Sequence, residues 1–167
     1  MNESRRYRVG VLTLSDKGSE GHRVDESGPV VQRLLASVGE MAQLAILPDD
    51  VDSIVSILKN WVDKEQLDLI VTTGGTGLSP RDVTPQATLQ VIDYEIPGMA
   101  EVMRMQSLKK TPHAMMSRAV VGVRHQTMIV NLPGSPKAAK ENLEAVLPAL
   151  PHALAKLTGD PSDCGQK

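Results

Sequence analysis

The sequence predicts one three-layer α/β domain, with helices on both faces of a mostly parallel, doubly wound sheet. Two observations favour this fold class: apolar, β-rich runs alternate with segments of helical periodicity, and each run ends in a polar or glycine-rich loop. The length of 167 residues fits a single domain with its own core. We expect residues 1–158 to form this domain and residues 159–167 to be a flexible polar tail.

The first expected strand covers residues 8–15, whose mostly apolar character suits a strand buried on both faces. Residues 16–25 are rich in glycine, serine and charge, so we expect a loop there. Apolar residues three and four apart predict a helix over 26–38, with Gly39 as its C-cap.

A second strand is expected over 41–47 and a third over 67–72. Between them, the pair Asp49 and Asp50 precedes a helix, because aspartate is a preferred N-cap residue. The apolar residues of this helix form one stripe: Val51, Ile54, Val55, Leu58, Trp61 and Val62.

The rest of the chain is expected to contain four more helices and a strand pair. Thr84 is expected to cap the next helix, with Pro85 at its first position. The remaining elements are a helix over 99–108, strands over 119–123 and 128–132, a helix ending near Val146, and a last helix over 151–157.

Composition excludes several classes of function. Aromatic residues make up 2% of the chain, with no phenylalanine, so the sequence offers no stacking platform for nucleic acid. A net charge of −2 gives no general attraction to nucleic acid or anionic lipid, and no apolar run is long enough to span a bilayer. The single cysteine, Cys164, and the absence of a signal-peptide pattern indicate a cytoplasmic protein. The composition and charge together predict no nucleic-acid or membrane partner.

A ligand site is expected at the carboxyl ends of the strands, where parallel sheets bind their ligands. Gly74, Gly75, Thr76 and Gly77 follow the third strand, and glycines there let backbone N–H groups approach a phosphate or a pterin. The alternative is a tight turn without a ligand. The motif is neither a Walker A loop nor a dinucleotide-binding fingerprint, because the lysine and the glycine spacing are absent.

Two aspartates are candidates for a metal site at this edge. Asp82 lies five residues beyond Gly77, and a carboxylate beside a polyphosphate calls for a cation such as Mg²⁺. The alternative for Asp82 is a solvated residue, or one that supports the Thr84 cap. Asp49 is an alternative N-cap, but Asp50 beside it leaves one of the two free.

Two further segments reach the same edge. Ser15 and Asp16 end the first strand and can hydrogen-bond to a ligand, although the sequence alone favours an ordinary loop there. The segment Asn131 to Lys137 places a helix N-terminus and the Lys137 ammonium at a strand end, which suits an anion, or is a simple capped turn. The four histidines lack metal-ligand spacing.

Together these motifs resemble those of the molybdenum cofactor biosynthesis (MogA/MoaB) family. The resemblance centres on residues 69–77 and 80–85 and spans residues 8–157 in order. It extends to the segments 15–16, 47–49, 97–101, 117–118 and 131–137.

The resemblance implies a homotrimer of doubly wound subunits, each a molybdopterin-binding domain. It implies that molybdopterin and ATP, with Mg²⁺, give adenylyl-molybdopterin and pyrophosphate. Asp49 and Asp82 match the catalytic, metal-holding aspartates, and residues 74–77 match the pterin-binding turn. The second pocket wall matches Asn131, Pro133, Gly134 and Ser135.

Two other functions stay open at this point: a molybdopterin carrier of the same fold without chemistry, and a molybdenum-insertion role. The pair of aspartates favours the enzyme over the carrier, because a pure binder has no need of two acidic residues beside a phosphate. The insertion role is the one that this domain plays inside larger proteins. We therefore expect a separate molybdenum-insertion protein as a downstream partner.

Overall fold

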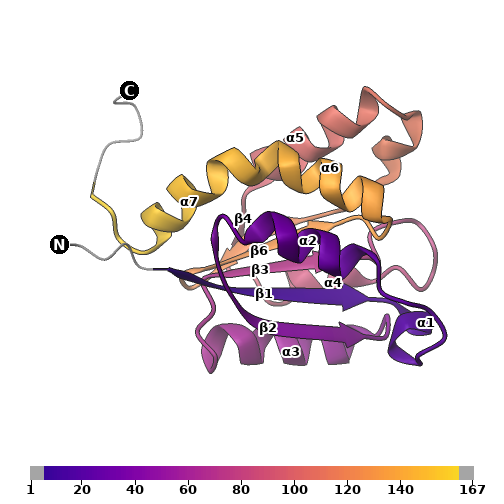
Figure 1. Cartoon of the computed structure of the whole chain (residues 1–167), viewed down its shortest axis with the longest axis horizontal. Coiled ribbons are helices and arrows are strands. Elements are labelled where there is room, and N and C mark those ends of the chain that lie inside the picture. Colours follow the sequence, from indigo (N-terminus) through magenta and orange to yellow (C-terminus); the bar gives the residue numbers. More distant parts are fainter. Residues whose placement is uncertain (1–5, 162–167) are drawn as a thin grey trace.

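The computed structural model describes residues 6–161 and has three layers, a six-stranded sheet between two layers of helices (Figure 1). Neighbouring strands follow the order β2-β1-β3-β6-β5-β4. The first four of these run parallel, and β5 and β4 are added as antiparallel neighbours at one edge. The strands are β1 (Tyr7–Leu14), β2 (Gly39–Leu47), β3 (Leu69–Thr73), β4 (Tyr94–Glu95), β5 (Val121–Arg124) and β6 (Thr127–Leu132). The predicted fold class is confirmed.

Helices cover both faces of this sheet (Figure 1). One face packs against α2 (Ser27–Leu35), α5 (Pro97–Leu108), α6 (Pro136–Val146) and α7 (Leu150–Leu157). The other packs against α3 (Val51–Asp63) and α4 (Thr84–Leu89). Short helical turns complete the chain: α1 (Asp16–Ser19), η1 (Pro112–Met116) and η2 (Leu147–Ala149).

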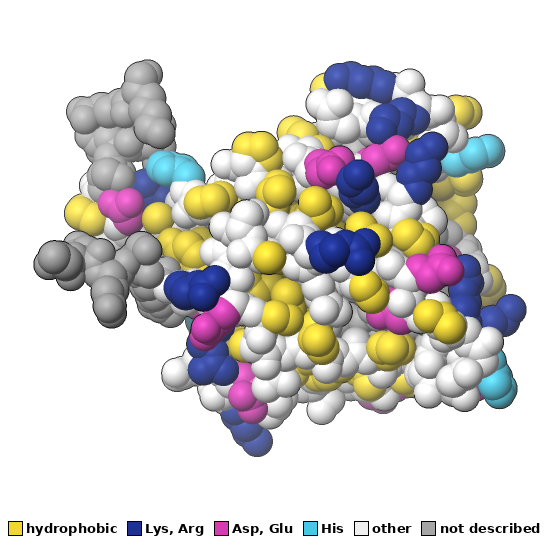
Figure 2. All heavy atoms as spheres, in the orientation of Figure 1, with side chains coloured by type: hydrophobic (Ala, Val, Ile, Leu, Met, Phe, Trp, Pro, Cys, Tyr) yellow, Lys and Arg dark blue, Asp and Glu magenta, His cyan; other side chains and the backbone are white. Residues whose placement is uncertain are grey.

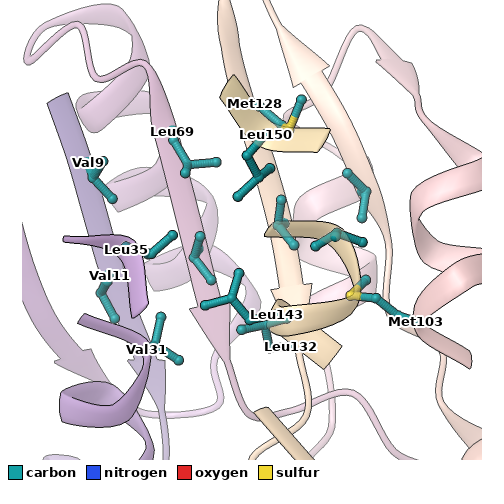
Figure 3. Close-up of a cluster of buried hydrophobic side chains, with 14 of the residues drawn as sticks. Val9, Val11, Val31, Leu35, Leu69, Met103, Met128, Leu132, Leu143 and Leu150 are labelled. Carbon is teal, nitrogen blue, oxygen red and sulfur yellow. The ribbon is translucent and has the colours of Figure 1, made fainter. Parts of the chain in front are cut away.

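Each layer has its own hydrophobic core. In the first, strand residues such as Val9 and Leu69 meet Leu35 of α2 and Leu143 of α6, all without exposed surface (Figure 3). In the second, the predicted stripe of α3 packs on the opposite face of the sheet. Strands buried on both faces need continuous apolar runs, which is why these runs are visible in the sequence.

Trp61 fills the second core and depends on a glycine of β1. Its side chain is 4% exposed. A Cβ atom placed on Gly10 would lie 2.9 Å from two carbons of the indole ring and 2.6 Å from Leu67 Cδ1. Gly10 therefore allows the aromatic ring to lie directly against the strand.

Three local expectations are wrong. Gly39 is the first residue of β2 and not a helix C-cap, since its Cα lies against the Tyr7 carbonyl where no Cβ would fit. The expected loop 16–25 begins with the single helical turn α1. Thr84 does not cap α4; the N-cap position is Val83, and the Thr84 hydroxyl donates to the Gly74 carbonyl at 2.9 Å.

The tail expected over residues 159–167 lies, from residue 162 on, outside the described residues, as does Cys164. Within residues 6–161, no helix is long and apolar enough to cross a bilayer. Basic and acidic side chains are interspersed on the face viewed in Figure 2, as a net charge of −2 allows.

The sheet order places a topological switch at β1. The chain passes from β1 to β2 on one side and returns to β3 on the other side of β1. Loops leaving the carboxyl ends of β1 and β3 therefore diverge, and such a point is where doubly wound sheets bind ligands. The candidate site lies there.

Asn131 joins four segments inside the sheet. Its side-chain amide donates to the hydroxyls of Thr72 and Thr88, each at 3.0 Å, and its carbonyl oxygen accepts from the Val120 N–H at 3.2 Å. The residue is fully buried. The amide nitrogen and the carbonyl oxygen of the Asn131 side chain are therefore both bonded within the protein.

We predict that Asn131→Ala lowers the free energy of unfolding by about 2–3 kcal/mol, because it leaves buried partners without their hydrogen bonds. Urea unfolding of the variant beside wild type measures this. Asn60→Ala, at a partly exposed position of α3, is the control and should change stability little. Unchanged stability with lost ligand binding would instead make Asn131 a ligand contact.

Candidate active site

A hollow of about 290 Å³ opens at the carboxyl edge of the sheet, beside the switch at β1. Segments far apart in the sequence meet there, from the end of β1, the end of β3 and the loop after β6. Seven of the predicted site residues line it: Ser15, Asp49, Gly74, Gly75, Asp82, Gly134 and Ser135.

Gly74 and Gly75 form the sharp turn after β3. Their φ angles are +106° and +70°, in the region that only glycine adopts freely. A Cβ on Gly74 would overlap the Leu14 carbonyl oxygen, and one on Gly75 would overlap the Thr84 hydroxyl. The second would also lie 3.0 Å from Asp49 Oδ1, so Gly75 brings bare backbone up to that carboxylate.

Three hydrogen bonds, to Leu132 and Thr84, hold this turn in place. The Gly74 N–H donates to the Leu132 carbonyl at 3.0 Å, which ties the turn to β6. The Thr84 hydroxyl donates to Gly74 O, and the Thr84 N–H donates to Gly75 O at 3.2 Å. The turn is therefore a fixed part of the sheet edge.

Only one of the two carboxylate oxygens of Asp49 accepts a hydrogen bond. Asp50 is the N-cap of α3, accepting from the Ser53 N–H at 2.9 Å, so Asp49 is the aspartate left over for other work. Asp49 Oδ2 accepts from the Asp16 N–H at 3.2 Å. Asp49 Oδ1 is buried and has no hydrogen-bond partner among the described residues.

The surroundings of Asp49 disfavour its negative charge. Burial raises the pKa of Asp49 above its ordinary value, and repulsion from the Asp16 and Asp82 carboxylates raises it further. The backbone N–H of Asp16 and the charge of Arg81 act in the opposite direction but do not cancel the rise. Negative charge at this point is in excess, as at a cation site.

Asp16 is held by Arg81, 65 residues further along the chain. The guanidinium donates to both carboxylate oxygens, at 2.9 and 2.7 Å. This pairing, with the Asp49 N–H as a second donor, holds the pKa of Asp16 below its ordinary value. Asp16 itself does not line the hollow, whereas its neighbour Ser15 does, with its hydroxyl accepting from the Gly18 N–H.

Asp82 is fixed by its own loop and by Arg118. Its Oδ2 accepts from the Ser79 N–H at 3.0 Å. The guanidinium of Arg118 donates to the carbonyls of Gly77 and Asp82, at 2.9 and 2.7 Å. These bonds join the end of the glycine turn to the loop that carries Asp82.

A second hollow, of about 350 Å³, lies on the other side of the turn. Thr76, Gly77 and Pro133 line it, so these three predicted site residues face this space. Its other walls come from Leu78 and from α5, η1 and α6, which contribute residues such as Met116 and Ala138. The turn thus separates a charged hollow from a more apolar one.

Three of the predicted site residues line neither hollow: Asp16, Asn131 and Lys137. Asn131 is buried within the sheet, where its side chain bonds other segments. Lys137 is an exposed residue of α6. The helix N-terminus beside it does reach the first hollow, through Ser135, whose hydroxyl accepts from the Ala138 N–H.

Sequence reasoning missed the wall formed by Thr13, Asp25 and Ser27. The Thr13 hydroxyl donates to Asp25 Oδ2 at 2.8 Å, and Asp25 Oδ1 accepts from the Gly28 N–H at 2.9 Å. The second bond is of the helix-capping kind, and an aspartate just before a helical stripe is a signal for it. The contact of Arg81 with Asp16 has no such local signal.

Comparisons with known proteins identify the family of the chain. Residues 10–152 match the family model MoCF_biosynth, described as a "Probable molybdopterin binding domain". A molybdopterin adenylyltransferase of Helicobacter pylori (strain J99) is 41% identical over 162 residues, which are 95% of this chain and 92% of that protein. The crystal structure of the molybdopterin biosynthesis enzyme MoaB from Thermus thermophilus is 53% identical with a TM-score of 0.87, and the match covers 94% of this chain and 99% of that one.

A longer relative contains the same unit. The molybdenum cofactor synthesis protein cinnamon of Drosophila melanogaster is 42% identical over 153 residues. These are 90% of this chain but 25% of cinnamon, so this chain spans about a quarter of that relative. Because the family model covers residues 10–152 and the fold is shared with solved MoaB and MogA structures, the chain belongs to the MoCF_biosynth family.

Proposed function

We propose that this chain is a molybdopterin adenylyltransferase, a nucleotidyltransferase of molybdenum cofactor biosynthesis. A phosphate oxygen of molybdopterin attacks the α-phosphorus of ATP, and the bond from that phosphorus to the bridging oxygen breaks. Adenylyl-molybdopterin forms and pyrophosphate leaves. The attacking group belongs to the substrate, so the protein's task is to position two phosphates and to offset their charge.

The half-buried Asp49 carboxylate beside the glycine turn is the observation that carries this proposal. Its Oδ1 is buried without a hydrogen-bond partner among the described residues, and Asp82 lines the same hollow as Asp49. A carrier of molybdopterin has no need for two carboxylates next to a bound phosphate, since they would repel it. A transferase needs them to hold a cation.

These residues fit Mg²⁺ as the cofactor. Magnesium is bound by one or two carboxylates together with substrate phosphates, and the Asp49 oxygen without a partner is such a ligand. When bound, the ion offsets the charge that develops on the transferred phosphoryl group. We place Asp49 and Asp82 as its ligands.

The two hollows suit two parts of the substrates. The first is lined by carboxylates, by the turn and by the N-terminal ends of α2 and α6, which favours phosphates with their cation. The second is more apolar and suits a flat heterocycle such as the pterin. Gly74 and Gly75 line the first hollow and the next two residues, Thr76 and Gly77, line the second, so one molecule can reach both.

We also propose a cytoplasmic homotrimer that passes its product to a molybdenum-insertion protein. Several large apolar side chains on α5 and η1 are exposed, Met105 by 63% and Met115 by 67%. Exposed apolar surface of this kind supports a subunit interface. The occurrence of a similar unit within the longer cinnamon protein supports a partner that acts on the same cofactor.

We predict that Asp49→Asn and Asp82→Asn each lower the rate of adenylyl transfer by about 10²-fold or more, the scale of one preorganised electrostatic group. The assay is transfer from radiolabelled ATP to molybdopterin over a series of Mg²⁺ concentrations. Asp52→Asn, an exposed position in the first turn of α3, is the matched control and should keep the wild-type rate. A wild-type protein that binds molybdopterin but transfers no label would be a carrier.

A second prediction concerns stability. Because the folded pKa of Asp49 is raised, the unfolded chain binds fewer protons at this group, and ionised Asp49 destabilises the fold at pH 7. Asp49→Asn should therefore unfold at a higher temperature than wild type at pH 7. The advantage should shrink as the pH falls through the raised pKa, and calorimetric melts at several pH values test this. A variant less stable at every pH would contradict the sign.

The trimer gives a third prediction. Met105→Glu with Met115→Glu places charges on the exposed apolar surface of α5 and η1 and should shift a trimer toward monomers. Sedimentation equilibrium at micromolar concentration measures the change. Val24→Glu, at an exposed position in the loop before α2 and outside α5 and η1, is the control for oligomeric state. A wild-type monomer under the same conditions would remove the proposal.

A further inference from the structure

We infer that Arg81 and Asp16 are positioning residues, which link the segments bearing Asp49 and Asp82 and hold both carboxylates in place for adenylyl transfer. The inference rests on the function proposed above and adds two residues that act through others. Neither Arg81 nor Asp16 lines the hollow in which Asp49 and Asp82 meet.

Asp16 is bonded to Asp49 in both directions. The Asp49 N–H donates to Asp16 Oδ1 at 3.0 Å, and the Asp16 N–H donates to Asp49 Oδ2 at 3.2 Å. The first bond fixes the backbone of Asp49 and the second fixes one side-chain oxygen. The remaining oxygen, Oδ1, is thereby set toward the Gly75 backbone.

Arg81 extends this link to Asp82, its neighbour in the chain. The loop is compact: the Asp82 N–H donates to the Ser79 carbonyl at 2.9 Å, and the Ser79 N–H donates to Asp82 Oδ2. A shift of the Arg81 backbone would therefore move Asp82. The guanidinium binds Asp16 through Nε to Oδ2 and Nη2 to Oδ1, a paired geometry that fixes orientation as well as distance.

Stability alone does not account for this pair. The Arg81 side chain is 63% exposed and that of Asp16 is 33% exposed, and exposed ion pairs contribute little to folding. Position, in contrast, matters greatly for catalysis, since a displacement of about 1 Å can cost about 10²-fold in rate. The pair is therefore expected to affect turnover much more than the melting temperature.

The test is a double-mutant cycle with Arg81→Gln, Asp16→Asn and both together. We expect each single variant to lower kcat about 10-fold, to change the KM for ATP less than about 3-fold, and to melt close to wild type. Because the residues act as one unit, the double variant should be no slower than either single one. Arg81→Lys, which keeps the charge but not the paired geometry, should recover part of kcat.

A matched control exists elsewhere in the fold. Arg124 binds Asp63 with the same paired geometry, at 3.0 and 2.9 Å, and neither residue lines the first hollow. Arg124→Gln and Asp63→Asn should leave kcat and KM at wild-type values. Equal losses of kcat in both pairs would show a general effect of removing an ion pair, and would overturn the inference.

A readout without activity separates this inference from the function itself. The Asp49 amide is protected by Asp16, so Arg81→Gln should speed its hydrogen exchange, measured by NMR, by several-fold relative to Arg124→Gln. A wild-type protein without transferase activity would overturn the proposed function while this measurement still tests the link. If Arg81→Gln raises only KM, and Asp16→Asn changes neither kcat nor exchange, Arg81 binds substrate directly and the inference is wrong.

Discussion

Because Gly74 and Gly75 both have positive φ angles, β3 turns sharply at its end and packs between the Leu14 carbonyl and Thr84. A side chain at either glycine would separate segments that must touch. The end of β1, the start of α4 and the loop after β6 all take their places from contacts with this turn. The same absence of side chains leaves backbone open beside Asp49, so the requirement of folding and that of ligand approach coincide.

Charge is the second organising factor at this edge. Asp49 carries a charge that its surroundings disfavour, whereas Asp16 has its charge matched by Arg81. The Asp16 carboxylate thus has its cation within the protein and supports Asp49, whereas the charge of the Asp49 carboxylate is not offset within the protein. Sites that bind cations and phosphates commonly show this division, because full internal satisfaction would leave nothing for the ligand.

The sequence predicted most of what local pattern controls. Five of the six strands, the stripe of α3 and the edge where Ser15, Asp49 and Gly74 meet follow from periodicity and from the geometry of parallel sheets, whereas the two-residue strand β4 was not predicted. Gly39 and Thr84 were misassigned because tertiary contacts, with Tyr7 and Gly74, outweigh capping preferences at those positions. No short-range rule could have paired Arg81 with Asp16, nor shown that Asn131 is used up inside the sheet.

The close approach of Trp61 to Gly10 has an experimental consequence. Trp61 is the only tryptophan of the chain. It belongs to α3, and its side chain lies in the core between α3 and the sheet, on the face away from α6. Its fluorescence therefore reports on one layer, whereas circular dichroism averages over all helices. Agreement of the two signals during denaturation would show that both cores melt together, and disagreement would reveal a partly folded species with one layer detached.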